Sequence, residues 1–183
     1  MAISEEEFRT WLDAGGILRR DAAFTPPRPE ESFTVFAQAA SAALPIGPLR
    51  QQAARFFDAK LGLTVDKKYD DASGLPDVDV ARVVIVAGDA RGTRLVHGRA
   101  VTNADLARAH AADPAGSGGL YLLAERCRSV WIVEANGEAD RASLLVSAIL
   151  ASVVLGPILS MAGDLFGVRT ARLKLEAKPS PYR

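Results

Sequence analysis

The single cysteine of the chain lies in a setting that suits nucleophilic chemistry. Cys127 stands between Arg126 and Arg128 in the segment ERCRS, and nearby cations stabilise a thiolate. A cysteine nucleophile also needs a base, and His97 and His110 are the two histidines of the sequence. No local signature joins these residues, and cysteine is often buried. We expect a structural thiol, and keep as the alternative an enzyme with a dispersed active site that uses Cys127 with a histidine.

The predicted positions of the two histidines are explained without a catalytic role. His97 falls in a predicted strand, where a histidine at the edge or surface is the ordinary case. His110 falls near the end of a predicted helix, where the helix dipole mildly favours a cation. With one cysteine and no short spacing between ligands, these residues do not match a zinc site.

The segment 63–79 holds five aspartates: Asp66, Asp70, Asp71, Asp77 and Asp79. Carboxylate oxygens are ligands of calcium and magnesium. The spacing matches no EF-hand loop, however, and Lys67 and Lys68 interrupt it, so we interpret the segment as a solvated loop. The glycines of 115–119 follow a predicted helix and lack the lysine of a phosphate-binding loop. We expect neither a metal nor a cofactor.

The charge balance argues against a polyanionic partner. The 22 basic side chains match the 22 acidic ones, so no overall field attracts nucleic acid or an anionic membrane. The segment 169–183 has a local basic excess, which we interpret as the solvent face of an edge strand. No aromatic side chains alternate with these charges, which further disfavours nucleic acid as a partner.

The cysteine count and the first residues bear on the compartment. One cysteine permits no intrachain disulfide, which suits a reducing cytosol. The opening MAISEEEF is acidic and lacks the positive and apolar regions of a signal peptide. We therefore expect a cytoplasmic protein.

Residues 1–62 are predicted to form a helical N-terminal layer. Ser4 and Glu7 have the spacing of a capping box, and Gly15 and Gly16 supply a stop. The segment 31–45 places Phe33, Phe36, Ala37, Ala40 and Leu44 at helical spacing. The segment 47–62 carries an apolar stripe between Gly47-Pro48 and Gly62, which indicates a third helix.

Residues 80–178 are predicted to form a mixed α/β part. The segments 81–88 and 93–101 indicate a hairpin, and 129–135 a further strand. Alternating apolar and charged residues predict a last strand over 169–177. The fold class is then α+β, with a mixed sheet of about four strands packed with helices. We treat 1–183 as a single domain.

The uncharged stretch 142–163 allows two interpretations. A membrane-spanning helix needs about 20 apolar residues, but Pro157 disfavours helix at Gly156. The continuous helix is then predicted over about Asp140–Leu155, which is short for a span. We favour a buried helix between two strands, in a βαβ-like unit, and keep the membrane span as the minority interpretation.

One face of this helix carries small side chains: Ser143, Ser147, Ala148, Ala151 and Ser152. If the chain itself does not cover that face, another protein or a second copy must, because large bare apolar patches are rare on monomers. We therefore expect an oligomeric, non-catalytic interaction factor, such as an adaptor, chaperone-like or immunity-like bacterial accessory protein.

Overall fold

The structure is a computed structural model that describes residues 28–39, 41–69, 78–113 and 119–177. Its described strands form one seven-stranded sheet in the order β2-β3-β4-β5-β1-β6-β7, and every neighbouring pair is antiparallel. The strands are β1 (Ser32–Ala37), β2 (Lys60–Tyr69), β3 (Val78–Ala87), β4 (Ala90–Ala100), β5 (Ser129–Glu134), β6 (Ile158–Leu159) and β7 (Leu165–Phe166).

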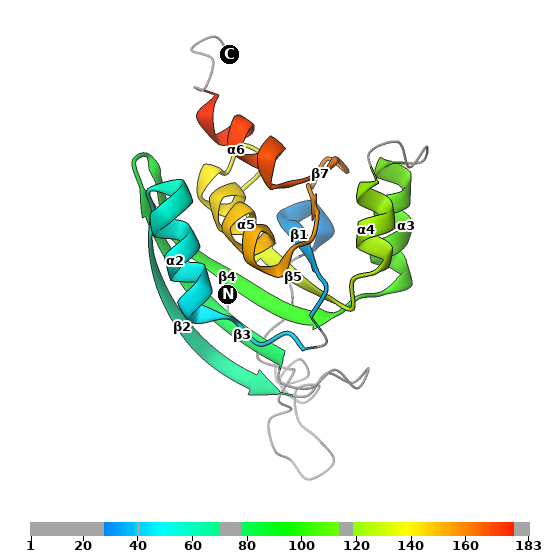
Figure 1. Ribbon diagram of the computed structural model, residues 1–183, viewed down its shortest axis with the longest axis horizontal. Helices are drawn as coiled ribbons and strands as arrows, with labels where there is room; N and C mark the ends of the chain where they lie inside the picture. The colour runs from blue at the N-terminus through cyan, green and yellow to red at the C-terminus, as the bar shows by residue number, and fades with distance from the viewer. Residues whose placement is uncertain (1–27, 40, 70–77, 114–118, 178–183) are drawn as a thin grey trace, which may run out of the picture.

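Helices cover the sheet from both sides. They are α2 (Ile46–Phe57), α3 (Asn103–Ala112), α4 (Leu120–Glu125), α5 (Arg141–Val154) and α6 (Val168–Glu176), besides the short 3-10 turn η1 (Pro29–Glu31). Strands β2, β3 and β4 curve around α2 and α5, while α3 and α4 lie at the opposite end of the sheet (Figure 1). The larger core cluster joins α2, α5 and α6 to one face, and a smaller cluster joins α3 and α4 to the other face of β1 and β5.

The expected sheet of about four mixed strands is wrong, and β1 is one reason. Phe33 and Phe36 have helical spacing, yet both belong to a strand that is buried along its whole length. Phe33 packs in the larger cluster and Phe36 in the smaller one. A strand covered on both faces need not show the alternation that marks a half-exposed strand, and in β1 even Ser32 and Thr34 are buried.

The helical layer predicted over residues 1–62 is wrong for the segment 31–45, which contains a strand, and for residues from Lys60 onward, whereas the helix predicted over 47–62 is confirmed as far as Phe57. Only α2 is an α-helix there, and it ends at Phe57, where Asp58 adopts a left-handed conformation with φ 47°. From Lys60 the chain runs into β2, which pairs with β3 over its length. The helix predicted over 4–15 lies outside the described residues.

The last predicted strand, 169–177, is also wrong, and with it the βαβ-like unit. This segment is the helix α6, in which Ala171 is buried and Val168 and Leu175 pack against the core. Those three residues are spaced as one helix face, whereas Leu173, which alternation places with Ala171 and Leu175, is 59% exposed. After α5 the chain instead enters β6, which runs antiparallel to β1.

Besides α2, four elements confirm the sequence predictions. Strands β3 and β4 form the expected hairpin, β5 covers the strand predicted over 129–135, and α5 spans Arg141–Val154. Helix α5 has 14 residues and contacts the sheet, α2 and α6. Within the described part of the chain, no helix combines the length and apolarity needed to cross a bilayer.

Candidate functional site

The surroundings of Cys127 do not suit a nucleophilic thiol. Its side chain is buried in the smaller cluster, and its Sγ donates a hydrogen bond to the Leu123 carbonyl at 3.3 Å. Burial raises the pKa of the thiol to about 11, so the thiol is protonated at neutral pH. The flanking Arg126 and Arg128 side chains are exposed and do not offset this desolvation.

The native protein is expected to resist alkylation at Cys127. A thiol pKa raised from 9.0 to about 11 leaves about a hundredfold less thiolate at neutral pH, and burial slows the reaction further. Intact mass after iodoacetamide treatment, with and without urea, measures the two rates. Equal rates in the folded and unfolded protein would restore the nucleophile interpretation.

The histidines lie in different surroundings from that thiol. His97 is buried on β4, where it pairs with Val80 and Ile132 on the neighbouring strands. His110 is exposed on α3, and its ring meets the Tyr121 ring edge-on at 4.8 Å. Among the described residues, no group of three or more histidine, cysteine or acidic side chains is arranged to hold a metal.

The aspartate segment is not a loop throughout. Asp66 belongs to β2 and Asp79 to β3, while Asp70, Asp71 and Asp77 lie outside the described residues. Asp79 is buried, and its Oδ2 accepts a hydrogen bond from the Leu44 N–H at 2.6 Å. This carboxylate therefore fastens the chain before α2 to the sheet.

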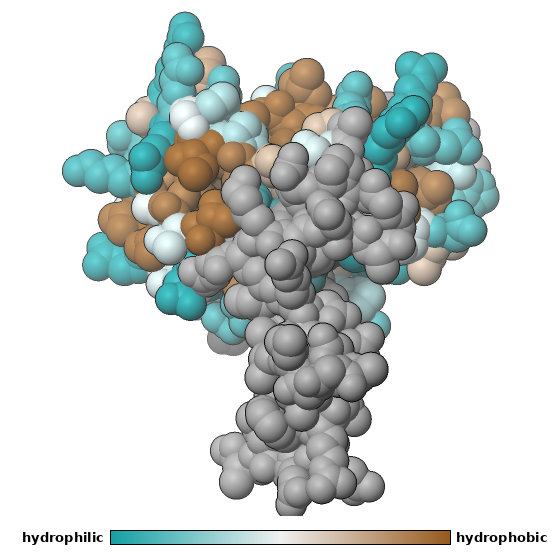
Figure 2. Space-filling view, turned by 90° about the horizontal axis from the view of Figure 1, so that it is seen from below, coloured by the Kyte–Doolittle hydropathy of each residue, from teal (hydrophilic) through white to brown (hydrophobic). Residues whose placement is uncertain are grey.

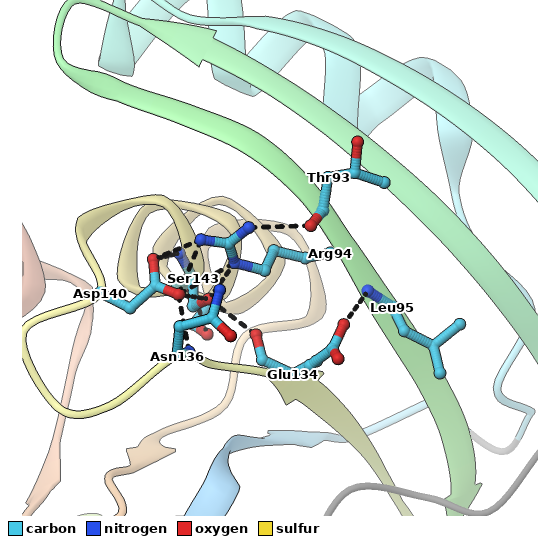
Figure 3. A network of polar contacts seen from close by, with 8 residues as sticks. Thr93, Arg94, Leu95, Glu134, Asn136, Asp140 and Ser143 are labelled. Atoms are coloured by element: carbon cyan, nitrogen blue, oxygen red, sulfur yellow. Dashed lines mark hydrogen bonds and ion pairs between the residues drawn. The ribbon is translucent and has the colours of Figure 1, made fainter. Parts of the chain in front are cut away.

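A polar network fixes the start of the central helix α5 (Figure 3). The Arg94 guanidinium on β4 donates to both Asp140 oxygens, at 2.8 and 2.7 Å through Nη2, and its Nε donates to Ser143 Oγ at 2.7 Å. Asp140 also caps α5 by accepting from the Ser143 N–H at 3.1 Å. Ser143 Oγ in turn donates to the Glu134 carbonyl on β5 at 2.7 Å. The network locks α5 against two strands.

Most of the small-residue face of α5 is covered by the chain itself. Ser143, Ser147, Ala148 and Ala151 are buried, and α5 contacts β1, β4, α2 and α6. The condition under which we expected a partner is therefore not met for these residues. Ser152 is only half-buried and remains open to an interface.

Ser152 and Ala151 line an apolar groove at the far end of α5. The groove has a volume of about 430 Å³ and lies between α4, the end of α5 and the start of α6. We call it the leucine groove, and its lining residues are Leu120, Leu123, Ala151, Ser152, Leu155, Gly156, Pro157, Gly167 and Val168.

Leu155 is the unusual residue of this groove. It is 65% exposed and adopts the left-handed conformation, with φ 56°, which costs a residue with a side chain about 1–2 kcal/mol. Two hydrogen bonds hold its backbone: its N–H donates to the Ala151 carbonyl at 3.0 Å, and Gln38 Nε2 donates to its own carbonyl at 2.9 Å. The chain thus presents a leucine to solvent at the mouth of an apolar groove.

Sequence reasoning did not identify Leu155 as a functional residue, although a signal was present. The Gly156-Pro157 pair ends α5, so the residue before it becomes the C-cap. C-caps and the residues after them often adopt the left-handed conformation. An exposed apolar residue at such a position is a candidate contact for a partner.

A second cavity, of about 460 Å³, lies between α2, the β3–β4 turn, α5 and α6. Arg141 crosses it from α5: its Nη1 donates to the Ala177 carbonyl at 3.2 Å, its Nη2 donates to the Leu175 carbonyl, and its Nε lies 3.3 Å from Asp89 Oδ2. These contacts join α6 and the hairpin to α5. The cavity is lined by three arginines and three acidic residues, so its charge selects neither anions nor cations.

Comparison of the chain with protein-family models finds no matching family. Searches of curated proteins and of solved structures likewise give no significant match. Function is therefore inferred from the geometry of the described residues.

Proposed function

We propose that the chain is a non-catalytic protein-interaction factor that binds an apolar segment of a partner protein in the leucine groove. The observation that carries the proposal is Leu155, which is 65% exposed in a costly backbone conformation beside that groove. A leucine in this state adds little to the stability of the chain that carries it. Burying the exposed two thirds of it against a partner would contribute about 1–2 kcal/mol.

The alternative, an enzyme that uses Cys127 with a histidine, has less support. The Cys127 thiol is buried and its pKa is raised, and the His110 ring packs edge-on against the Tyr121 ring. An adaptor, chaperone-like or immunity-like role in the bacterial cytoplasm suits a protein that presents a groove to another protein and needs no reactive group.

Replacement of Leu155 by glutamate is expected to abolish co-purification of the partner. A carboxylate at the mouth of the groove would have to be desolvated when an apolar segment binds. Leu173→Glu is the matched control, because Leu173 is a similarly exposed leucine on α6 that does not line the groove. The measurement is the stoichiometry of proteins recovered from native cells with wild type and each variant.

Light scattering on the purified chain distinguishes the two kinds of partner. A dimer that Leu155→Glu converts to monomer identifies the occupant as a second copy. A monomer with a stoichiometric foreign protein in the cell extract identifies a separate partner. Recovery of the same proteins with Leu155→Glu as with wild type would refute the proposal.

A further inference from the structure

Strands β2, β3 and β4 lie at one edge of the sheet, and the face that they turn away from the larger core cluster is, after the leucine groove, a second candidate binding surface. The register pairs Lys60 with Val86, Gly62 with Val84, and Thr64 with Arg82. The next strand continues each row, because Val86 pairs with Arg91, Val84 with Thr93, and Arg82 with Leu95. We call these nine residues the outer face: Lys60, Gly62, Thr64, Arg82, Val84, Val86, Arg91, Thr93 and Leu95.

This face is open to solvent. Eight of its nine residues are exposed and Leu95 is half-buried, whereas the alternate residues of β3, Ala81, Val83 and Ile85, are buried in the larger cluster. Antiparallel sheets often have one solvated side, which is ordinarily polar. Val84 and Val86 depart from that rule, since they are 45% and 48% exposed.

Charge and apolarity are arranged on this face in a definite pattern. Val84 stands at the centre of the nine, with Val86 beside it, and the basic side chains of Lys60, Arg82 and Arg91 flank the two valines. None of the nine residues is acidic. In the view from below, on the left, brown apolar groups are bordered by teal polar groups (Figure 2).

We propose that the outer face binds an acidic segment of a partner protein that places an apolar side chain against Val84. The cations of Lys60 and Arg91 beside an apolar centre complement a peptide whose carboxylates flank one apolar residue. Gly62 has no side chain, so the surface beside Val84 is open; a Cβ built on Gly62 would lie 3.6 Å from the Val84 Cβ. This surface is distinct from the leucine groove, so the chain would hold two segments at once, as an adaptor does.

Other anionic partners fit the same residues less well. The nine residues include no aromatic side chain, and stacking on aromatic rings supplies much of the affinity for single-stranded nucleic acid. Near an anionic bilayer each lysine or arginine contributes about 1 kcal/mol, so three of them give only weak membrane binding. An acidic peptide uses both the cations and the valines.

The test is a selection of random short peptides, displayed on phage, against the whole purified protein. We expect the selected peptides to be rich in aspartate and glutamate around one large apolar residue. Their affinity, measured by fluorescence anisotropy, is expected to fall about tenfold with Val84→Glu and with the double variant Lys60→Glu/Arg91→Glu. Because all three positions are exposed, the variants should retain the wild-type circular dichroism spectrum. The double variant should also weaken the salt dependence of binding.

Two controls separate this proposal from the proposed function. Arg50→Glu, an exposed charge reversal on α2, and Leu155→Glu in the leucine groove should both leave peptide binding unchanged. Peptides that lack acidic residues, or that bind the double variant as tightly as wild type, would overturn the inference. Loss of binding with Leu155→Glu alone would overturn it too, while supporting the groove. Tighter binding of phosphatidylglycerol vesicles or single-stranded DNA than of the selected peptides would assign the face to another partner.

Discussion

Replacement of Asp140 by alanine is expected to lower the free energy of unfolding by about 3–5 kcal/mol. The variant leaves the Arg94 guanidinium without its carboxylate, although only 11% of the Arg94 side chain is exposed. The guanidinium then keeps only its hydrogen bonds to Ser143 Oγ and the Thr93 carbonyl, and no negative charge offsets its lost hydration. The variant also removes the N-cap of α5, the helix that contacts both the sheet and two other helices.

Urea denaturation followed by circular dichroism measures this effect, and Asp89→Ala is its control. Asp89 also pairs with an arginine, Arg141, but its own side chain is 68% exposed. Exposed ion pairs contribute about 0–1 kcal/mol, so the control should change stability little. Equal effects of the two variants would mean that the network in Figure 3 does not hold α5.

Protonation of the Asp140 carboxylate is expected to lower the stability of the protein at acid pH. Burial alone would raise the pKa of Asp140, but hydrogen bonds from Arg94, Asn136 and Ser143 outweigh burial and lower the pKa from 3.8 to about 2. Because the folded-state pKa is the lower one, this contribution is complete above about pH 4 and disappears as the pH falls towards 2. The Asp140→Ala variant should lose stability less steeply than wild type across that interval.

Replacement of Gly156 by alanine is expected to destabilise the fold by about 3 kcal/mol, the upper end of the usual cost of overpacking. A Cβ at this position would lie 1.9 Å from the Phe36 carbonyl oxygen. The obstacle is the backbone of the buried strand β1, which cannot rotate away as a side chain can. The adjoining hydrogen bond from the Phe36 N–H to the Pro157 carbonyl, at 3.0 Å, ties the same segment to β1.

Gly47→Ala is the matched control for this variant. A Cβ on Gly47 meets nothing within 4 Å, and the residue lies in α2, where alanine is favoured over glycine by about 0.5–1 kcal/mol. Thermal unfolding should therefore shift downwards for Gly156→Ala and stay level or rise for Gly47→Ala. A Gly156→Ala protein as stable as wild type would show that the α5–β6 connection can move away from β1.

The sequence predicted the elements whose pattern is local. Helix α5 follows from an uncharged run that ends at Gly156-Pro157, and the β3–β4 hairpin from two apolar runs around a turn. The error at β1 arose because its burial comes from distant neighbours. Strand β1 lies between β5 and β6 and is covered on both faces, so nothing in its own residues distinguishes it from a buried helix.

Two residues of the leucine groove are among the candidates named from the sequence. Ser152 and Ala151, named from the small-residue face, line the leucine groove. Leu155 was not named: the Gly156-Pro157 pair indicates its position as the end of α5, but the groove beside it forms only when α4 and α6 come near that end. The Arg94–Asp140 pair joins residues 46 positions apart. No periodicity within one segment indicates such a pair, which only the completed sheet brings together.

The most direct test of the account is photocrosslinking from the leucine groove in living cells. A photoreactive phenylalanine in place of Ser152 lies on the groove wall, and the same group in place of Arg50 lies on the exposed side of α2. We predict one covalent adduct of defined mass from position 152 and none from position 50. No adduct from position 152, or the same adducts from both positions, would contradict the claim that this groove binds a protein.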